Sequence, residues 1–338
     1  MNKKILAVIF LIIILAITGC NSEENNRRAR KTEFFMGTVV EVILYGDEED
    51  LAKDKREKAF TKVFNEIRNL EEKFSVEKIN KEHPIPLDEE KTYLLRKSLY
   101  FSEITDGAFD ITVGPLVKLW NISPGEDNKV PEKEEIDKVI SLVNYKKIKI
   151  VAPGIIHMED KGMVVDFGGI AKGYAADKVA LILREEDINS AIINLGGNVY
   201  AFGEKTWKFG IQDPFMKRGD YLGVVSLKNQ SLVTSGIYER YFEENGKIYH
   251  HIFDTKTGYP VENDLLSVSV ISEKSLDGDA LSTAAFALGL DKGIKLLEDY
   301  QGAEGIFVTK NNEIFLTSGI SKEDFQLVER GKYEIKKR

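Results

Sequence analysis

The feature that most constrains the fold is a succession of short β-type segments joined by turns rather than by helices. Residues 190–194, 207–212 and 223–227 are rich in apolar and β-branched side chains, and glycine-containing turns separate them. Turns join antiparallel neighbours, because a parallel pair needs a crossover of about a dozen residues or more. Helical patterns gather early and late in the chain instead of alternating strictly with strands. We therefore predict an α+β fold, with a mixed, largely antiparallel sheet and packed helices.

Apolar spacing of three and four residues marks the helices. The clearest case is the segment 53–74, in which Phe60, Val63, Phe64, Ile67 and Leu70 fall on one face. Further helices are expected at 88–105, 133–143, 171–185, 279–288 and 291–300. Further strands are expected at 32–44 with a break at Gly37, and at 147–151, 162–166, 248–254, 265–272, 305–309 and 313–317.

The N-terminal segment is typical of a targeting sequence. Lys3 and Lys4 precede an apolar run over residues 5–17, which is shorter than the roughly 20 residues of a membrane span and suits the core of a signal peptide. Residues 17–20 (ITGC) resemble a bacterial lipobox, in which the cysteine is lipidated. We expect a lipoprotein signal peptide over 1–19 and lipidation at Cys20, with a plain signal peptide or an uncleaved anchor as alternatives.

This interpretation sets the domain organisation and the location. Residues 20–32 are polar and charged and predict a tether, followed by a single domain over 33–330. Cys20 is the only cysteine, so the lipidated chain would have no disulfide and no thiol chemistry. We expect a protein anchored by lipid to the cell membrane, on its extracytoplasmic face.

The charge balance excludes one class of partner. The formal net charge is −8, and an acidic protein lacks the basic surface that nucleic-acid binding requires. Small molecules and other proteins are the expected partners.

A glycine-rich stretch, VDFGGIAKGYAADKV over 165–179, is the first candidate site. Gly168 and Gly169 let a ligand approach the backbone closely, and the helix that follows would present unbonded N–H groups and a positive dipole end to a phosphate. Lys172 adds a full charge and Asp166 an acceptor. The stretch matches neither common nucleotide-loop pattern, and a tight strand-to-helix turn with a solvated lysine is the alternative.

A second candidate lies in DGDALSTAAFALG, residues 277–289. On a helix Asp279 and Thr283 are four residues apart and share one face, whereas Ser282 lies one position off that line. A carboxylate with a hydroxyl suits a hard cation such as Mg²⁺. The alternative is a capping aspartate with a threonine bonded to its own helix.

Two adjacent histidines form a third candidate. His250 and His251 fall on an expected strand, so their side chains point to opposite faces and one can line a site. Surface histidines on an edge strand are the alternative, and the spacing fits no zinc pattern. Two weaker candidates are Phe109, a stacking surface, and Arg240, which either reaches a phosphate or belongs to a turn.

Together these motifs resemble the ApbE family in content and order. The matching blocks are MGT (36–38), DGAFDITVGPL (106–116), VDFGGIAKGYAAD (165–177), NLGGN (194–198), TSGIYERYF (234–242), HHIFDTKTGYP (250–260) and DGDALSTAAFALG (277–289). Members of this family are FAD:protein FMN transferases and are often lipoproteins. The resemblance covers roughly residues 33–320.

The resemblance implies a reaction and a set of site residues. FAD is the substrate and Mg²⁺ the cofactor; the FMN moiety is transferred to a Thr or Ser hydroxyl of an extracytoplasmic target protein, and AMP leaves. Carried over by position, the FAD contacts are Met36, Ala108, Phe109, Asp110, Asp166, Lys172 and Phe253, the last replacing an aliphatic residue of the family. The metal ligands are the Gly169 carbonyl, Asp279 and Thr283, with Ser282 where some relatives carry a third acid. His251 is the candidate base.

Two other functions fit the same residues. A Mg²⁺-dependent FAD pyrophosphatase would release FMN and AMP with water as the nucleophile. A non-catalytic FAD-binding lipoprotein would show no turnover.

Overall fold

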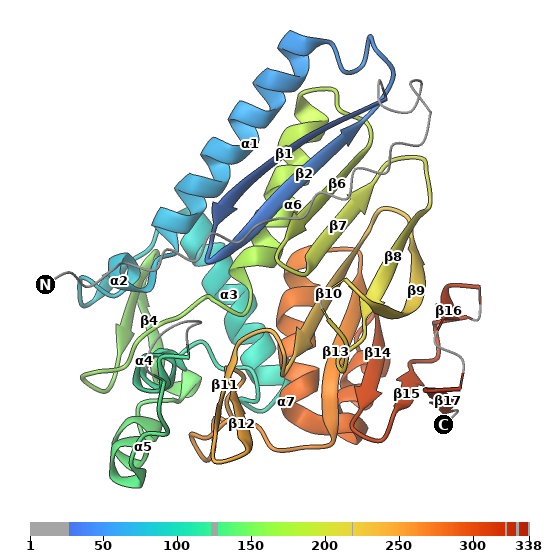
Figure 1. The fold of residues 1–338 in the computed structure, drawn as a ribbon. Helices are drawn as coiled ribbons and strands as arrows, with labels where there is room; N and C mark the ends of the chain where they lie inside the picture. The colour runs from blue at the N-terminus through green and yellow to red at the C-terminus, as the bar shows by residue number, and fades with distance from the viewer. Residues whose placement is uncertain (1–26, 123–127, 218, 322, 329–330, 337–338) are drawn as a thin grey trace, which may run out of the picture.

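A nine-stranded sheet forms the centre of the computed structural model (Figure 1), which describes residues 27–122, 128–217, 219–321, 323–328 and 331–336. The strand order is β1-β2-β6-β7-β10-β13-β14-β15-β17, and every pair is antiparallel except β15 with β17. The sheet confirms the predicted α+β class. Its strands are β1 Arg28–Phe35, β2 Thr38–Tyr45, β6 Ala191–Leu195, β7 Asn198–Phe202, β10 Gln230–Gly236, β13 Leu265–Ser272, β14 Ala303–Thr309, β15 Glu313–Leu316 and β17 Glu334–Lys336.

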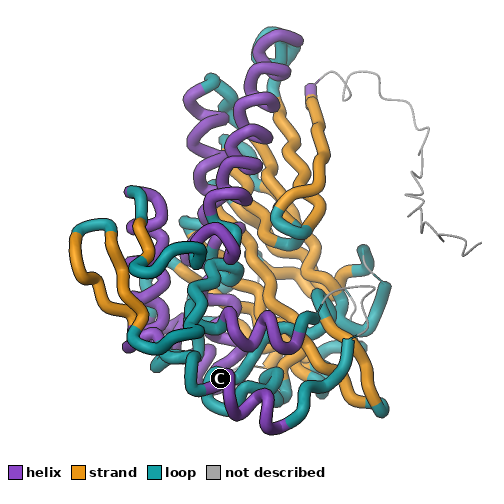
Figure 2. The backbone as a smooth tube through the Cα atoms, turned by 90° about the vertical axis from the view of Figure 1, so that its left-hand side faces the viewer, coloured by secondary structure: helices purple, strands orange, loops and turns teal. Residues whose placement is uncertain are grey.

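Helices cover one face of this sheet, as Figure 2 shows from the side. They are α1 Lys53–Lys73, α3 Glu89–Ile104, α6 Ala171–Glu185 and α7 Ser275–Asp299, with α6 packed between α1 and α7. The expected apolar stripe of α1, including Phe60, Val63 and Ile67, is buried in the main core. This confirms the helix that its spacing predicts.

A small second sheet covers part of the other face. It consists of β8 Trp207–Gln212, β9 Tyr221–Leu227 and β16 Phe325–Leu327. Successive residues of a strand point to opposite faces. Accordingly Phe307 of β14 belongs to the main core, whereas Ile306 and Val308 pack in a separate cluster with Val225.

The remaining elements form a lobe beside the helical layer. They are α2 Val76–Ile79, β3 Ile85–Pro86, α4 Gly114–Trp120, α5 Lys133–Ile140, the 3₁₀ turn Tyr145–Lys147, β4 Ile148–Ala152, β5 Ile155–Met158, β11 Tyr241–Glu244 and β12 Lys247–His250. Trp120 is in a separate core cluster with α4, α5, β11 and β12, whereas the buried residues of α2, β3, β4 and β5 belong to the main core. The Trp120 indole N–H donates to the Gly258 carbonyl (2.9 Å), and its ring packs on Tyr249 and Phe253.

Several boundaries differ from the sequence predictions; for example, β12 ends at His250, whereas a strand is predicted over 248–254. The tether predicted over 20–32 is wrong from Arg28 onward, because β1 begins there and pairs with β2 as far as Tyr45. The strand predicted at 162–166 is also wrong. The Asn80 side chain bonds both the N–H and the carbonyl of Val165 (2.8 Å each) and so takes the place of a neighbouring strand. The helices predicted at 279–288 and 291–300 form α7, with a kink at Gly289.

The predictions for the N-terminus stay outside the structure. The predicted signal peptide and Cys20 lie outside the described residues. Within the described part of the chain, no helix has the length and apolar character needed to cross a membrane.

Candidate functional site

A cavity of about 620 Å³ brings most of the predicted site residues together. It is lined by the β1–β2 hairpin, the loop after α3, the start of α6, the facing ends of β7 and β10, the segment after β12, and α7. The predicted residues that line it are Ala108, Phe109, Asp110, Asp166, Gly169, Lys172, His251, Phe253, Asp279 and Thr283. Thus the glycine stretch and the Asp279–Thr283 face of α7, far apart in sequence, share one cavity.

The two glycines just before α6 lie so close to neighbouring side chains that a Cβ at either position would be crowded. A Cβ on Gly169 would lie 3.0 Å from the Phe109 ring, and a Cβ on Gly168 would lie 3.0 Å from Asp166 Oδ1. Asp166 Oδ1 accepts from the Gly168 N–H (2.7 Å) and so fixes the turn that leads into the helix. Glycine at these positions lets Phe109 lie directly against the backbone, which bounds the cavity on that side.

Helices α6 and α7 each hold the start of the other through a carboxylate. Asp279 Oδ2 accepts from the Gly173 N–H (2.8 Å), and Asp177 accepts from the N–H groups of Ser275 (2.8 Å) and Leu276 (3.0 Å). The contact is close because Gly173 has no side chain: a Cβ there would lie 2.3 Å from the Ser275 carbonyl oxygen. The start of α6 and residue 279 are therefore fixed relative to each other.

Near the hydrogen bond between Gly173 and Asp279, several oxygen atoms remain available to bind a cation. Gly169 precedes α6 and its N-cap Ile170, so the Gly169 carbonyl is not part of the helical hydrogen-bond ladder, and the Gly173 N–H donates to Asp279. The Gly169 carbonyl, the second oxygen of Asp279 and the Thr283 hydroxyl all belong to residues that line the cavity. A set of oxygen donors of this kind fits Mg²⁺, which accepts few protein ligands and keeps several waters.

The charges around the cavity favour a bound cation as well. Its lining contains four carboxylates, Asp110, Asp166, Glu239 and Asp279, against two cations, Lys172 and Arg240. A pyrophosphate would add further negative charge. Among the described residues no group of three or more His, Cys, Asp or Glu side chains is arranged to hold a metal, so carbonyl and hydroxyl oxygens would have to complete the site.

Ser282 lies outside this donor set. Its side chain is fully buried and is not among the residues that line the cavity. The hydroxyl donates to the Asp279 carbonyl (3.0 Å) and is bonded to Ser235 Oγ (2.9 Å). The Ser282 hydroxyl is thus buried and hydrogen-bonded within the protein, whereas the resemblance places residue 282 where some relatives have a metal ligand.

His251 is held in a defined orientation by the backbone of Arg240. Both its main-chain N–H and its ring Nδ1 are 3.2 Å from the Arg240 carbonyl oxygen. A carbonyl only accepts, so Nδ1 carries the proton and Nε2 is the acceptor. Burial, followed by the charge of Arg240, lowers the pKa of His251 to about 3. The ring is therefore neutral at physiological pH and can accept a proton at Nε2.

The neighbouring His250 belongs to the core. Its ring is buried edge-on against Phe286, and its Nε2 donates to the Val261 carbonyl (3.0 Å). Burial lowers the pKa of His250 to about 4. The two histidines thus lie in different surroundings, with His251 alone of the pair at the cavity.

The two aspartates predicted to contact a ligand differ in how their oxygens are used. Asp110 accepts from the N–H and hydroxyl of Thr112 (2.8 and 2.6 Å) and from the Tyr145 N–H (2.8 Å), so it mainly shapes the loop after α3. Burial raises the pKa of Asp110 and of Asp166, and for Asp166 the Gly168 N–H, Arg240 and Lys172 oppose the rise.

The amides at the start of α6 are mostly occupied, which differs from the expectation of unbonded donors. The Ala171 N–H donates to the Phe167 carbonyl, the Gly173 N–H to Asp279 and the Tyr174 N–H to the Ile170 carbonyl. Lys172 Nζ lies 3.5 Å from the Gly168 carbonyl and 3.9 Å from Asp279 Oδ1. Attraction for an anion at this end therefore comes chiefly from the helix dipole and Lys172.

Met36 lies beside the cavity and does not line it. It sits at the β1–β2 turn with a positive φ of 52°, its N–H donates to Glu71 (2.6 Å), and its side chain packs on the main core. The next two residues, Gly37 and Thr38, line the cavity. Sequence reasoning from single motifs missed Thr38, Asn198, Ser235 and Thr255, although each lies in one of the blocks on which the resemblance rests.

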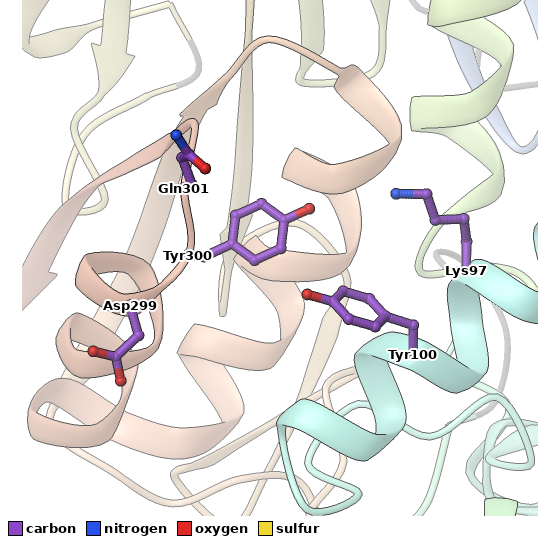
Figure 3. Close-up of a pocket in the computed structure, with 5 residues that line it drawn as sticks. All are labelled: Lys97, Tyr100, Asp299, Tyr300 and Gln301. Carbon is purple, nitrogen blue, oxygen red and sulfur yellow. The ribbon is translucent and has the colours of Figure 1, made fainter.

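A second hollow, of about 580 Å³, lies between α3 and the end of α7 (Figure 3). Lys97 Nζ and the Tyr300 hydroxyl both bond the Asp277 carboxylate, at 3.0 and 2.9 Å. This carboxylate is thereby paired and ties α3 to α7. The hollow contains none of the predicted site residues.

The fold is α+β, and its cavity gathers four carboxylates, two cations and a neutral histidine between the start of α6 and the Asp279–Thr283 face of α7. The model of the ApbE family matches residues 36–307, and the chain belongs to this family. An FAD:protein FMN transferase of Klebsiella pneumoniae (strain 342) is 36% identical over 305 residues, which cover 87% of this chain and 93% of the relative. One of Treponema pallidum (strain Nichols) is 31% identical over 341 residues, 92% of this chain and 93% of the relative.

Solved structures agree with this assignment. The crystal structure of the ApbE protein from Thermotoga maritima matches with a TM-score of 0.77 at 33% identity, over 86% of this chain and 97% of that one. The resemblance inferred from the seven sequence blocks is confirmed.

Proposed function

We propose that this protein is an FAD:protein FMN transferase that moves the FMN moiety of FAD to a Thr or Ser hydroxyl of an extracytoplasmic target protein. The observation that carries the proposal is the single cavity in which the Gly168–Gly169 turn, Lys172, His251 and the Asp279–Thr283 face of α7 meet. The names of the relatives point to the same activity.

Different residues of the cavity have different roles in the proposed reaction. Lys172 and the α6 dipole attract the pyrophosphate, and the ring of Phe109 offers an apolar surface beside it. His251 Nε2 accepts the proton of the attacking hydroxyl. The hydroxyl oxygen forms a bond to the FMN phosphorus, the bond from that phosphorus to the bridging oxygen breaks, and AMP leaves with that oxygen.

The proposed reaction also uses a divalent cation. We assign the Gly169 carbonyl, Asp279 and Thr283 as the residues that would hold Mg²⁺, which when bound supplies neutralisation of charge on the phosphate oxygens. Catalysis of phosphoryl transfer depends mainly on positioning the reactants and on stabilising charge in this way, so the protein has little covalent chemistry to perform.

The test is an acceptor-labelling assay. The protein is incubated with FAD, MgCl₂ and a candidate acceptor from an extracytoplasmic redox complex, and in-gel flavin fluorescence and AMP are measured. Fluorescence on the acceptor with an equal amount of AMP is expected. AMP release without labelling indicates the pyrophosphatase instead, and the absence of both indicates a binding protein.

The location is a separate proposal. We propose that residues 1–19 are removed and that the lipidated Cys20 anchors the protein on the extracytoplasmic face of the cell membrane, where a target protein would be reached. Mass spectrometry of the mature N-terminus tests this; a mature chain that retains residues 1–19, or an unmodified Cys20, contradicts it.

A further inference from the structure

Arg240 is a cation of the cavity that the proposed reaction has not yet used. It lies in the turn between β10 and β11 and lines the cavity, at the mouth rather than in the core. A methyl group placed on Gly37 would lie 3.6 Å from Arg240 Nη2, so the arginine side chain extends from its own turn to the β1–β2 hairpin. The guanidinium therefore lies across one side of the opening.

The charge of Arg240 reaches the groups that matter for transfer. It is the largest charge effect on the pKa of His251, which it lowers, and it also lowers the pKa of Asp166. Lys172, the other cation of the cavity, lies within ion-pair distance of Asp279. Among the residues that the structure describes, no carboxylate lies within 4.0 Å of the Arg240 guanidinium.

We propose that the Arg240 guanidinium binds the phosphate of the FMN moiety and stabilises it during its transfer. The inference rests on the proposed function. His251 accepts the proton of the attacking hydroxyl, so the phosphorus under attack must lie near His251. Arg240 lines the same cavity and is the cation whose charge acts most strongly on that histidine. A guanidinium can donate two parallel hydrogen bonds to two phosphate oxygens, which a single ammonium cannot do in the same geometry.

The backbone of the same residue strengthens the assignment. The Arg240 carbonyl fixes the His251 ring, while its side chain would hold the phosphate, so one residue sets the distance between the proton acceptor and the reacting phosphorus. During the step the hydroxyl proton passes to His251 Nε2, the new oxygen–phosphorus bond forms, and AMP departs. The charge that builds on the remaining phosphate oxygens is what the guanidinium stabilises.

The test separates the side chain from the backbone. Arg240→Ala removes the guanidinium and keeps the carbonyl that orients His251. We expect kcat for AMP release from FAD, with MgCl₂ and the acceptor present, to fall about 10²-fold to 10³-fold, while the Kd for FAD rises less than about tenfold. Arg240→Lys should recover no more than about a tenth of the lost rate. Added guanidinium ion at tens of millimolar should partly restore the Arg240→Ala rate.

A matched control removes a neighbouring charge without touching the proposed contact. Lys256→Ala removes a solvent-exposed cation that pairs with Asp106 (3.4 Å), and we expect it to leave kcat within about twofold. Circular dichroism and thermal melting verify that the Arg240 variants are folded; Arg240→Lys and Arg240→Gln serve if Arg240→Ala is not.

Three outcomes would overturn the inference. They are an Arg240→Ala rate within about threefold of wild type, a loss confined to FAD affinity with kcat unchanged, and full recovery in Arg240→Lys. Failure of the proposed function is a different result: the wild-type protein itself would then neither label the acceptor nor release AMP.

Discussion

Single residues decide the protonation state of this site. His251 has its Nδ1 proton fixed on the Arg240 carbonyl and a pKa lowered to about 3 by burial and by the Arg240 charge. A histidine with the ordinary pKa of about 6.5 would be half protonated, and so half inactive as a base, near that pH. This one stays neutral well below it.

The pH dependence of the rate follows. Between about pH 5 and 7.5 we expect kcat/KM for transfer to be nearly flat, because protonation of His251 begins only as the pH approaches 3. The measurement is AMP release across that range, with His251→Ala as the variant whose residual rate, about 10²-fold to 10⁴-fold lower, shows that the base is this residue. An acid limb centred near pH 6.5 in the wild type contradicts the assignment.

The same histidines make the fold sensitive to acid. The pKa values of His250 and His251 are lowered to about 4 and about 3, below that of an unfolded histidine, so between these values and about pH 6.5 the unfolded chain binds more protons. The free energy of unfolding therefore falls as the pH is lowered through this window, and is fully retained above it. For this reason each point of the rate profile below about pH 6.5 needs a circular dichroism check that the protein is folded.

Asp279 has two roles that one substitution can separate. One oxygen holds the Gly173 N–H, and the other faces Lys172 at 3.9 Å beside the proposed cation site. Asp279→Asn keeps an oxygen for Gly173 but removes the negative charge that a hard cation requires. We expect the melting temperature to change little, Mg²⁺ binding measured by calorimetry to be lost, and metal-dependent AMP release to fall by at least about 10²-fold.

Retention of Mg²⁺-dependent turnover in a folded Asp279→Asn protein would remove Asp279 from the metal site. Asp279→Ala serves as the comparison, because it removes both roles and should also lower stability.

At the scale of elements, the site depends on how closely α6 and α7 approach. The two helices exchange carboxylate-to-amide bonds through Asp177 and Asp279, and the missing side chain of Gly173 allows the contact. Helix propensity alone would favour alanine over glycine here by about 1 kcal/mol. The close contact between the helices opposes this preference. A Cβ on residue 173 would lie 2.3 Å from the Ser275 carbonyl oxygen, and a backbone atom cannot rotate aside as a side chain can.

The clash should decide the outcome of Gly173→Ala. We expect a net loss of about 1–3 kcal/mol in the free energy of unfolding, measured by urea denaturation, together with a fall in transfer because Asp279 loses its fixed distance from the start of α6. Leu181→Ala, at an exposed position of the same helix, is the control and should leave transfer unchanged. A Gly173→Ala protein that is as stable as wild type, or more stable, would show that the helices can separate without cost.

At the scale of the whole molecule, the sequence predicted classes and motifs better than boundaries. The turn-linked strands and the apolar face of α1 led to the correct fold class. Antiparallel pairing and helix amphipathicity both follow from the spacing of residues close together in the sequence. The error at residues 162–166 has a non-local cause, since the partner of Val165 is the side chain of Asn80. The early start of β1 is likewise set by pairing with β2 through Tyr45.

The site was predictable in outline for the same reason. Asp279 and Thr283 share a face at helical spacing, so a sequence can suggest them. Nothing local indicates that the Gly173 amide turns to Asp279, that Ser282 packs away from the cavity, or that the Arg240 carbonyl orients His251. These features depend on contacts between segments far apart in the chain, and they became visible only with the fold.

We propose that one cavity combines a cation site with a proton acceptor, so that FAD is cleaved between its two phosphates and its FMN moiety is transferred to the acceptor protein. The most direct measurement follows acceptor flavin fluorescence and AMP together while MgCl₂ is titrated and then removed with EDTA. We expect labelled acceptor and AMP to rise in equal amounts with Mg²⁺, and both to stop forming when Mg²⁺ is chelated. AMP and labelling that are indifferent to the metal, or AMP that forms while the acceptor stays dark, would contradict it.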